Sequence, residues 1–258
     1  MKHLVVAAHA GHELLLWKWL RQAQPDVVVL TNGAGATGTP RLQPTQDNLS
    51  AAGARWVPNV VAPVADSVIY RALLAGDARL FMQWRDALLA HVIAQGIDCI
   101  VADEAEDYNP SHDLCRLLVN EVVVLAAERG HPLRNFGYPT VGHPSPPARL
   151  QAESHQVVEL SPAELQAKLV DMRRYAGAFG GQLERELDGF LAEFGTQAYG
   201  RECLFAARPT RYERGESASA KPHFEIVGEQ RLAEGVYQHV IRGAHLQAAA
   251  DQLRAAAH

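Results

Sequence analysis

The stretch HLVVAAHAGHE at residues 3–13 decides the fold, because a run of core residues there ends abruptly in titratable side chains. Residues 3–8 form a continuous run typical of a parallel strand that is covered on both faces. Residues 13–23 follow directly and have the pattern of a helix. A buried strand has no structural need for two histidines and a glutamate at its end. The stretch therefore predicts a strand-to-helix unit of an α/β fold, with a functional site at the turn.

The rest of the first half repeats this alternation of apolar strand and amphipathic helix. Further strands are predicted at residues 26–31, near 56–62 and at 97–103. Helices are predicted at residues 45–54, 77–95 and 113–129. Such an alternation is typical of a sheet whose strands are joined by helical crossovers. We therefore expect an α/β fold with a Rossmann-like, mostly parallel sheet and helices on both faces.

The second half has a different pattern of elements, with a strand predicted at residues 156–160 and mainly helices after it. Ser161, Pro162 and Glu164 have the spacing of a capping box, which marks a helix start. The helical stretches that follow are predicted at residues 161–179, at 182–207 with breaks at Gly195 and Gly200, and, after a polar loop at 208–220, at 228–257. We therefore expect an α/β domain over residues 1–200 and a C-terminal helical extension over 201–258, packed on the same domain.

The composition of the 258-residue chain limits the partners that we expect. The net charge is −5 and there is no block of Lys or Arg, whereas nucleic acids and anionic lipids reward clustered positive charge. A small-molecule substrate is therefore expected, with neither nucleic acid nor membrane as a partner. The sequence has no apolar run near the roughly 18 residues of a membrane span and no signal peptide pattern. We expect a cytoplasmic protein, and the sequence leaves a homo-oligomer open.

Histidines follow two of the predicted strands at their carboxyl ends, where open α/β sheets bind ligands. The first strand ends at His9, with His12 three residues later, and the strand at residues 97–103 runs into a polar segment that carries His112. Three neutral imidazoles with one open position suit zinc, which lowers the pKa of a bound water to about 7. This arrangement would supply the nucleophile of a hydrolase. The alternative is that His9 and His12 cap a helix and that His112 is a surface residue.

Two motifs resemble those of the PIG-L/LmbE-like family of metal-dependent N-acetylglucosaminyl deacetylases. The family carries Ala-His-Pro-Asp-Asp-Glu after its first strand and His-Pro-Asp-His before a later helix. AHAGHE at residues 8–13 and YNPSHD at 108–113 stand in the corresponding places. TNGAGATG at 31–38 resembles the glycine-rich loop of the family, PVADS at 63–67 its substrate loop, and residues 157–175 the strand and helix that follow. The resemblance covers roughly residues 1–180.

The resemblance implies a ligand set and a substrate loop. His9 matches the first histidine ligand of the family and His112 the last, while a ligand aspartate falls on His12. Glu13 matches the glutamate that closes the first motif, and Asp66 matches a carboxylate of the substrate loop. The implied cofactor is one divalent ion, Zn²⁺, with Fe²⁺ as the alternative.

Two catalytic positions of the family are replaced in this chain. The aspartate that acts as general base falls on Gly11, and the histidine that opens the second motif falls on Asn109, whose amide can still stabilise an oxyanion. General-base assistance contributes about 10²- to 10⁴-fold, so its loss weakens hydrolysis without necessarily abolishing it. Glu13, Glu104 and Asp107 are the candidates for a substitute base.

The expected function is removal of an N-acyl group, such as acetyl, from an amino sugar or a related small metabolite by metal-activated water. Arg41 in the glycine-rich loop is a candidate contact for an anionic substrate. Two alternatives remain open at this point. The histidines could hold iron(II) for oxygen chemistry, with Glu13 or Asp107 as the carboxylate ligand. The chain could also be a non-catalytic descendant that binds a sugar or a partner.

Overall fold

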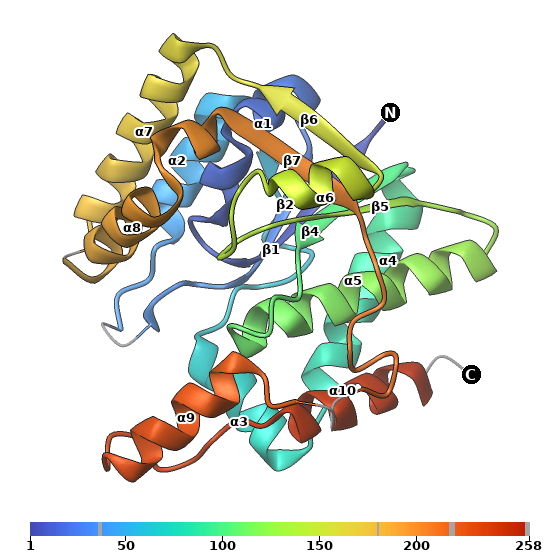
Figure 1. Cartoon of the computed structure of the whole chain (residues 1–258). Helices are drawn as coiled ribbons and strands as arrows, with labels where there is room; N and C mark the ends of the chain where they lie inside the picture. Colours follow the sequence, from blue (N-terminus) through green and yellow to red (C-terminus); the bar gives the residue numbers. More distant parts are fainter. Residues whose placement is uncertain (36–37, 180, 217–219, 256–258) are drawn as a thin grey trace.

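A computed structural model describes residues 1–35, 38–179, 181–216 and 220–255 of the chain. The described residues form one seven-stranded sheet in the order β3-β2-β1-β4-β5-β7-β6 (Figure 1). Its strands are β1 (His3–His9), β2 (Asp26–Thr31), β3 (Arg55–Trp56), β4 (Cys99–Asp103), β5 (Arg134–Tyr138), β6 (His155–Glu159) and β7 (Arg201–Ala206). Pairing is parallel from β3 through β5, and β7 runs antiparallel to both β5 and β6. The predicted α/β fold with a mostly parallel sheet is confirmed.

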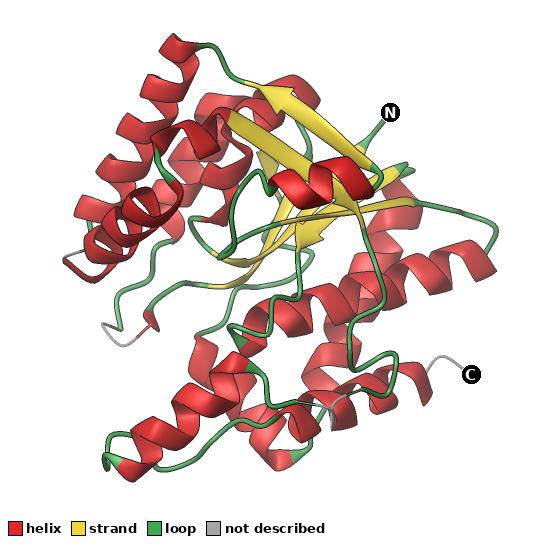
Figure 2. Ribbon diagram, in the orientation of Figure 1, coloured by secondary structure: helices red, strands yellow, loops and turns green. Residues whose placement is uncertain are grey.

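Helices cover both faces of this sheet (Figure 2). Alternate residues of β1 enter two different cores, with Leu4 and Val6 on one side and Val5 on the other. The first core contains α3 (Asp66–Ala75), α4 (Arg79–Gln95), α5 (Pro110–Glu128) and α10 (Gly243–Ala255), and the second contains η1 (His12–Leu16), α1 (Trp17–Ala23) and α2 (Leu42–Ala52). Burial on both faces explains why the strand sequences are apolar without alternation.

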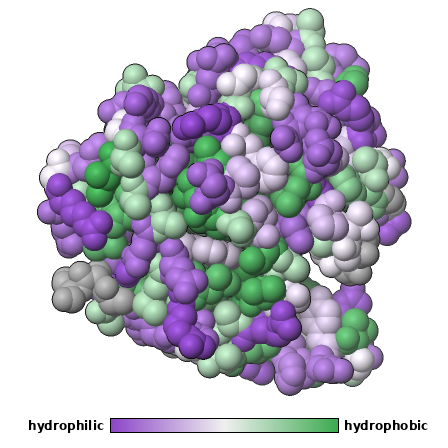
Figure 3. Space-filling model, turned by 180° about the vertical axis from the view of Figure 1, so that it is seen from behind, coloured by the Kyte–Doolittle hydropathy of each residue, from purple (hydrophilic) through white to green (hydrophobic). Residues whose placement is uncertain are grey.

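The remaining helices lie in the second half of the chain. They are α6 (Pro147–Ala152), α7 (Pro162–Gly177), α8 (Gly181–Phe194), η3 (Thr196–Gly200) and α9 (His223–Ala233). Ser161 and Glu164 form the predicted capping box at the start of α7. None of the described helices has the length and apolar character needed to cross a membrane. Viewed from behind, hydrophobic residues gather toward the middle of the surface and hydrophilic ones toward its outline (Figure 3).

Several predicted elements are wrong. The strand expected near residues 56–62 is reduced to the two residues of β3, and α3 and β5 were not predicted. Residues 201–206 form β7 rather than a helix, because they pair on both sides with strands distant in sequence. A domain boundary at residue 200 would therefore cut the sheet. The final helical stretch is interrupted at residues 234–242, and its predicted end at 256–257 lies outside the described residues, as do parts of two predicted loops.

The antiparallel strand β7 also holds the segment that follows β1. Glu202 of β7 is buried and accepts hydrogen bonds from the backbone N–H groups of Lys18 (3.0 Å) and Trp19 (2.7 Å), in the first turn of α1. Its carboxylate also pairs with Lys168 of α7 at 2.9 Å, and this ammonium donates to the carbonyl of Leu15. A carboxylate at a helix N-terminus satisfies N–H groups that have no partner within the helix. Glu202 of β7 thus fixes the position of α1, the helix that follows the turn with His9 and His12.

Candidate functional site

Three imidazole rings meet beyond the carboxyl end of the sheet. His9 is the last residue of β1, His12 begins η1, and His112 lies in the first turn of α5. The ring centroids are 5.1 Å apart for His9 and His12, 4.9 Å for His9 and His112, and 4.7 Å for His12 and His112. The rings come together because β1 and β4 are neighbours in the sheet, and α5 follows β4. The structure therefore brings together the three histidines that the sequence singled out.

Asp103, the last residue of β4, orients His12. Its Oδ2 lies 2.7 Å from His12 Nδ1 and accepts from the backbone N–H of Ala8 at 3.1 Å, while its Oδ1 accepts from the Tyr138 hydroxyl at 2.6 Å. Burial by itself would raise the pKa of Asp103, but the nearby imidazoles and the Tyr138 hydroxyl lower it well below its ordinary value. An ionised Asp103 therefore places the proton of His12 on Nδ1 and leaves Nε2 as an acceptor.

Thr140 fixes the tautomer of His112, as Asp103 does for His12. The Thr140 hydroxyl donates to Glu106 Oε2 at 2.6 Å, so its oxygen is left to accept from His112 Nδ1 at 3.0 Å. Glu106 is itself fixed by backbone N–H groups, among them those of Thr140 and Val141. Burial, followed by the charges that His12 and His9 would carry, lowers the pKa of His112 well below its ordinary value. His112 is therefore neutral, with its Nε2 free to accept.

Of the three rings, His9 gives the most direct indication of a bound ligand. Its Nδ1 lies 2.8 Å from Thr31 Oγ1 and 3.3 Å from Asp66 Oδ1, whereas its Nε2 is buried with no partner among the described residues. Burial lowers the pKa of His9 to about 4, so the ring is neutral. A buried acceptor without a partner costs about 1–3 kcal/mol and is rare in native proteins. The unpaired nitrogen therefore indicates a ligand.

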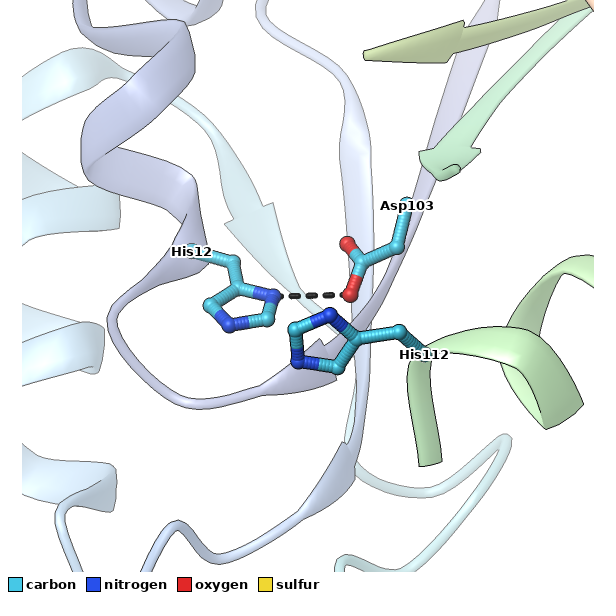
Figure 4. Close-up of side chains that lie close together, drawn as sticks. All are labelled: His12, Asp103 and His112. Atoms are coloured by element: carbon cyan, nitrogen blue, oxygen red, sulfur yellow. Dashed lines mark hydrogen bonds and ion pairs between the residues drawn. The ribbon is translucent and has the colours of Figure 1, made fainter. Parts of the chain in front are cut away.

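The spacing of the rings fits a shared metal ion. Zinc binds an imidazole nitrogen at about 2.0–2.1 Å, so rings that share one ion through Nε2 would have centroids roughly 5 Å apart. The observed separations of 4.7–5.1 Å agree with this. The ligand atoms within 4.8 Å of one another nevertheless belong to His12, Asp103 and His112, a set without His9 (Figure 4). Because Asp103 already accepts three hydrogen bonds, we favour His9 over Asp103 as the third ligand.

Asp66 and Arg41, predicted to bind substrate, both lie beside this cluster. Asp66 begins α3. Its Oδ1 accepts from the Ser111 hydroxyl at 3.0 Å and also lies near Nδ1 of His9. Arg41 packs against Gly33, where a Cβ atom would lie only 2.6 Å from Arg41 Nε. That Nε is buried with no partner among the described residues, and the charge of Arg41 contributes to the lowered pKa of His9.

Asn109 and Glu13 are held in structural hydrogen bonds. Asn109 is the N-cap of α5, and its side-chain oxygen accepts from the backbone N–H of Ser111 at 2.8 Å. Glu13 is 1% exposed, and its carboxylate accepts from the backbone N–H of Gly11 at 2.7 Å and from the Asn48 amide at 3.3 Å. Burial raises the pKa of Glu13. Glu13 therefore fixes the turn between His9 and His12, and both residues stay predictions as catalytic groups.

Glu104 and Asp107, two candidates for the substitute base, line a different cavity. Glu104 forms a bidentate ion pair with Arg149 at 2.6 and 2.7 Å, and Asp107 pairs with Arg211 at 2.8 Å. Both carboxylates are thus engaged by arginines of another cavity, and Glu104 stays a prediction as the substitute base.

Packing and backbone conformation favour the glycine at position 11. Gly11 has a φ of 107°, and a Cβ atom there would lie 2.8 Å from the Tyr175 ring and 3.0 Å from its hydroxyl. An aspartate at this position would need a strained backbone and a displaced Tyr175. No pattern in the sequence indicates the contributions of Tyr175 and Thr140, whereas Asp103 is recognisable as the charged end of a predicted strand.

Comparisons with known proteins show the fold. The sequence matches no family model and no curated protein sequence. Among solved structures, the pseudoaglycone deacetylase Dbv21 aligns with a TM-score of 0.51 and 14% identity, over 81% of this chain and 99% of that one. A triple mutant of a deacetylase from the teicoplanin biosynthetic pathway aligns with a TM-score of 0.52 and 12% identity, over 80% and 97%. The chain has the fold of these deacetylases. At such identities, the function has to be argued from the site.

Proposed function

We propose that the protein is a metal-dependent hydrolase that removes an N-acyl group, such as acetyl, from an amino sugar or a related small metabolite. The observation that carries this proposal is the cluster of three imidazoles, one of which has a buried Nε2 without a partner among the described residues. The fold shared with two deacetylases supports the same class of reaction. A small-molecule substrate agrees with the net charge of −5.

In this proposal His9, His12 and His112 hold one divalent ion, with zinc as the first choice. Asp103 and Thr140 do not bind the ion but fix the tautomers of His12 and His112, as carboxylates and hydroxyls do behind metal-binding histidines. Zinc bound in such a site lowers the pKa of a water ligand to about 7 and polarises a carbonyl group. Imidazole ligands would add no negative charge that offsets this effect.

Two carboxylates could accept the proton that the family base would take. Glu13 is nearly inaccessible and is already bonded to the turn, whereas Asp66 lies beside His9 with 13% of its side chain exposed. We therefore place Asp66 first and Glu13 second. Asn109 can contribute an amide N–H to the developing oxyanion, and Arg41 can bind an anionic group of the substrate.

Metal analysis tests the site directly. Protein purified without chelator should contain about one equivalent of zinc, and His112→Ala should contain none, because it removes a ligand. Asp103→Asn should keep the site but bind zinc about 10- to 100-fold more weakly. His155→Ala, which changes an exposed histidine on β6, is the matched control and should bind like the wild type. Metal-free wild-type protein, or retention of zinc by His112→Ala, would contradict the proposal.

Activity needs a separate measurement. Zinc-loaded protein should release acetate from at least one member of a panel of N-acetylated amino sugars, with Asp66→Asn reducing kcat more than Glu13→Gln does. If no compound in a broad panel is hydrolysed by fully loaded protein, the assignment as a deacetylase fails even though the metal site stands.

One observation supports an alternative function. His12, Asp103 and His112 form a set of two histidines and one carboxylate, which is the ligand set of iron(II) oxygenases. The same metal analysis separates the two functions, because iron together with oxygen-sensitive protein would favour oxygen chemistry over hydrolysis. Absence of any metal would favour a non-catalytic descendant.

A further inference from the structure

A second cavity lies on the other side of the segment that joins β4 to α5. It has a volume of about 290 Å³, close to the lower limit of about 300 Å³ for small-molecule pockets. Its wall contains three carboxylates, Glu104, Asp107 and Glu153. It also contains the five guanidinium groups after which we name it the arginine cavity: Arg116, Arg149, Arg208, Arg211 and Arg214.

The segment between β4 and α5 serves both sites with different residues. Asp103 and Glu106 face the imidazole cluster, where they fix His12 and, through Thr140, His112. Glu104 and Asp107 line the arginine cavity instead. The arginine cavity is therefore a distinct space that borders on the proposed metal site.

The positive charge of the arginine cavity exceeds its negative charge. Glu104 and Glu153 both pair with Arg149, and Asp107 pairs with Arg211. Five guanidinium groups against three carboxylates leave a formal charge of +2 in the wall, within a chain whose overall charge is −5. A concave site that concentrates one sign of charge attracts ligands of the opposite sign.

Arg116 supplies the buried part of this charge. It is 2% exposed, and no carboxylate among the described residues forms an ion pair with it. Its guanidinium donates four hydrogen bonds to neutral oxygens, namely the carbonyls of Ala102, Asp103 and Phe136 and the side chain of Asn135. Arginine has five N–H donors, so one N–H on Nη1 remains for a ligand. No described carboxylate contacts this buried cation directly, and an anion beside it would offset part of the cost of its burial.

Two further arginines stand at the rim. Arg208 has 68% of its side chain exposed and lies a loose 3.6 Å from Glu153. Arg214 is 46% exposed and pairs with Glu216, which does not line the cavity. Guanidinium groups bind phosphate oxygens in a bidentate fork, and several of them around one pocket favour a divalent oxyanion.

We propose that the arginine cavity binds a small anion with a phosphate group, which is held by Arg116 at the base of the cavity and by Arg208 and Arg214 at its rim. The excess of guanidinium groups over carboxylates in the wall suits an oxyanion, and the volume leaves room for the organic part of a small phosphate monoester. This ligand is independent of the proposed hydrolase function, because its site contains none of the three histidines.

Calorimetry with two probes, inorganic phosphate and glucose 6-phosphate, tests the proposal at constant ionic strength. Saturable binding of at least one probe is expected, and the tighter probe shows whether the ligand is the free ion or an ester. The double variant Arg208→Gln with Arg214→Gln should weaken binding at least tenfold. The control double variant, Arg173→Gln with Arg201→Gln, removes the same charge from two other exposed ion pairs and should leave the affinity unchanged.

The same titration on chelator-treated His112→Ala separates this site from the metal site. Unchanged affinity is expected there, whether or not the metal proposal holds. Three results would overturn the inference: neither probe binds, both double variants lose affinity equally, or binding disappears in His112→Ala. Because Arg208 and Arg214 are exposed, their replacement is not expected to affect folding.

Discussion

The imidazole cluster and the arginine cavity border on one segment but differ in what they leave unpaired. In the cluster, Nδ1 of each ring has a partner, whereas the buried Nε2 of His9 remains an acceptor without a partner among the described residues. In the cavity, carboxylates pair with most cations, and an N–H of Arg116 is left as a donor. An unpaired acceptor suits a cation and an unpaired donor suits an anion. The unfilled hydrogen-bonding capacity thus indicates the ligand better than the residue types do.

The largest expected effect concerns Arg116 and the stability of the segment that both sites share. Arg116→Met should lower the free energy of unfolding by about 3 kcal/mol or more, because each buried acceptor that it strands costs about 1–3 kcal/mol. Arg85→Met is the matched control, since this buried arginine donates to one backbone carbonyl, that of Leu253, and among the described residues otherwise pairs only with the exposed Asp86. It should lose only about 1–2 kcal/mol in the same urea titration. Equal losses in the two variants would mean that the four hydrogen bonds of Arg116 contribute no more to stability than the contacts of Arg85.

The next effect is the acid limit of stability, which should come from the imidazole cluster rather than from the cavity. The pKa of His9 is about 4 in the folded protein, against an ordinary value of 6.5. Between these pH values the unfolded chain binds the additional proton at His9, so the contribution of His9 to stability decreases as the pH falls. A difference of this size corresponds to about 3 kcal/mol. The lowered pKa of His112 acts in the same direction, whereas that of Asp103 contributes only below its ordinary value of 3.8. The raised pKa values of Glu13 and Asp113 act in the opposite direction, so the contribution of His9 is read from the difference between the wild type and a variant.

Urea titrations of metal-free protein between pH 7 and pH 4 would measure this loss. His9→Gln keeps a polar side chain of similar reach but does not titrate, so its stability should vary less over the same range. A profile as steep as that of the wild type would assign the acid sensitivity to other groups. No histidine lines the arginine cavity among the described residues, so Arg208→Gln should not change the profile.

The sequence predicted the parts of this molecule that depend on local patterns. The strands β1, β2 and β4 were found because burial on both faces makes their sequences apolar throughout. The strand β7 was missed because its residues RECLFA are compatible with a helix and become a strand only through pairing with β5 and β6. Propensity is a weak prior where pairing of distant segments decides.

The same distinction applies to the sites. The three histidines could be predicted because they follow strand ends, where ligands of α/β folds gather. Thr140 and Tyr175 could not, because each acts on a residue from another part of the chain. The arginine cavity also escaped prediction, since its wall combines segments around Glu104, Gly137, Arg149 and Arg211. Its arginines are scattered along the sequence and form no block of charge.

The smallest expected effect tests why the imidazole side of the comparison has no carboxylate at position 11. Gly11→Ala places a methyl group against Tyr175, on a backbone with a φ of 107°. Gly76→Ala is the matched control, because Gly76 also has a positive φ, of 64°, but no atom within 4 Å of the added Cβ. Both variants should lose stability through backbone strain, of about 1–3 kcal/mol. Gly11→Ala should lose roughly 1 kcal/mol more, the lower end of the cost of overpacking. If urea titrations gave the two variants equal stability, Tyr175 would have room to move. The packing would then tolerate the glycine at position 11 rather than require it.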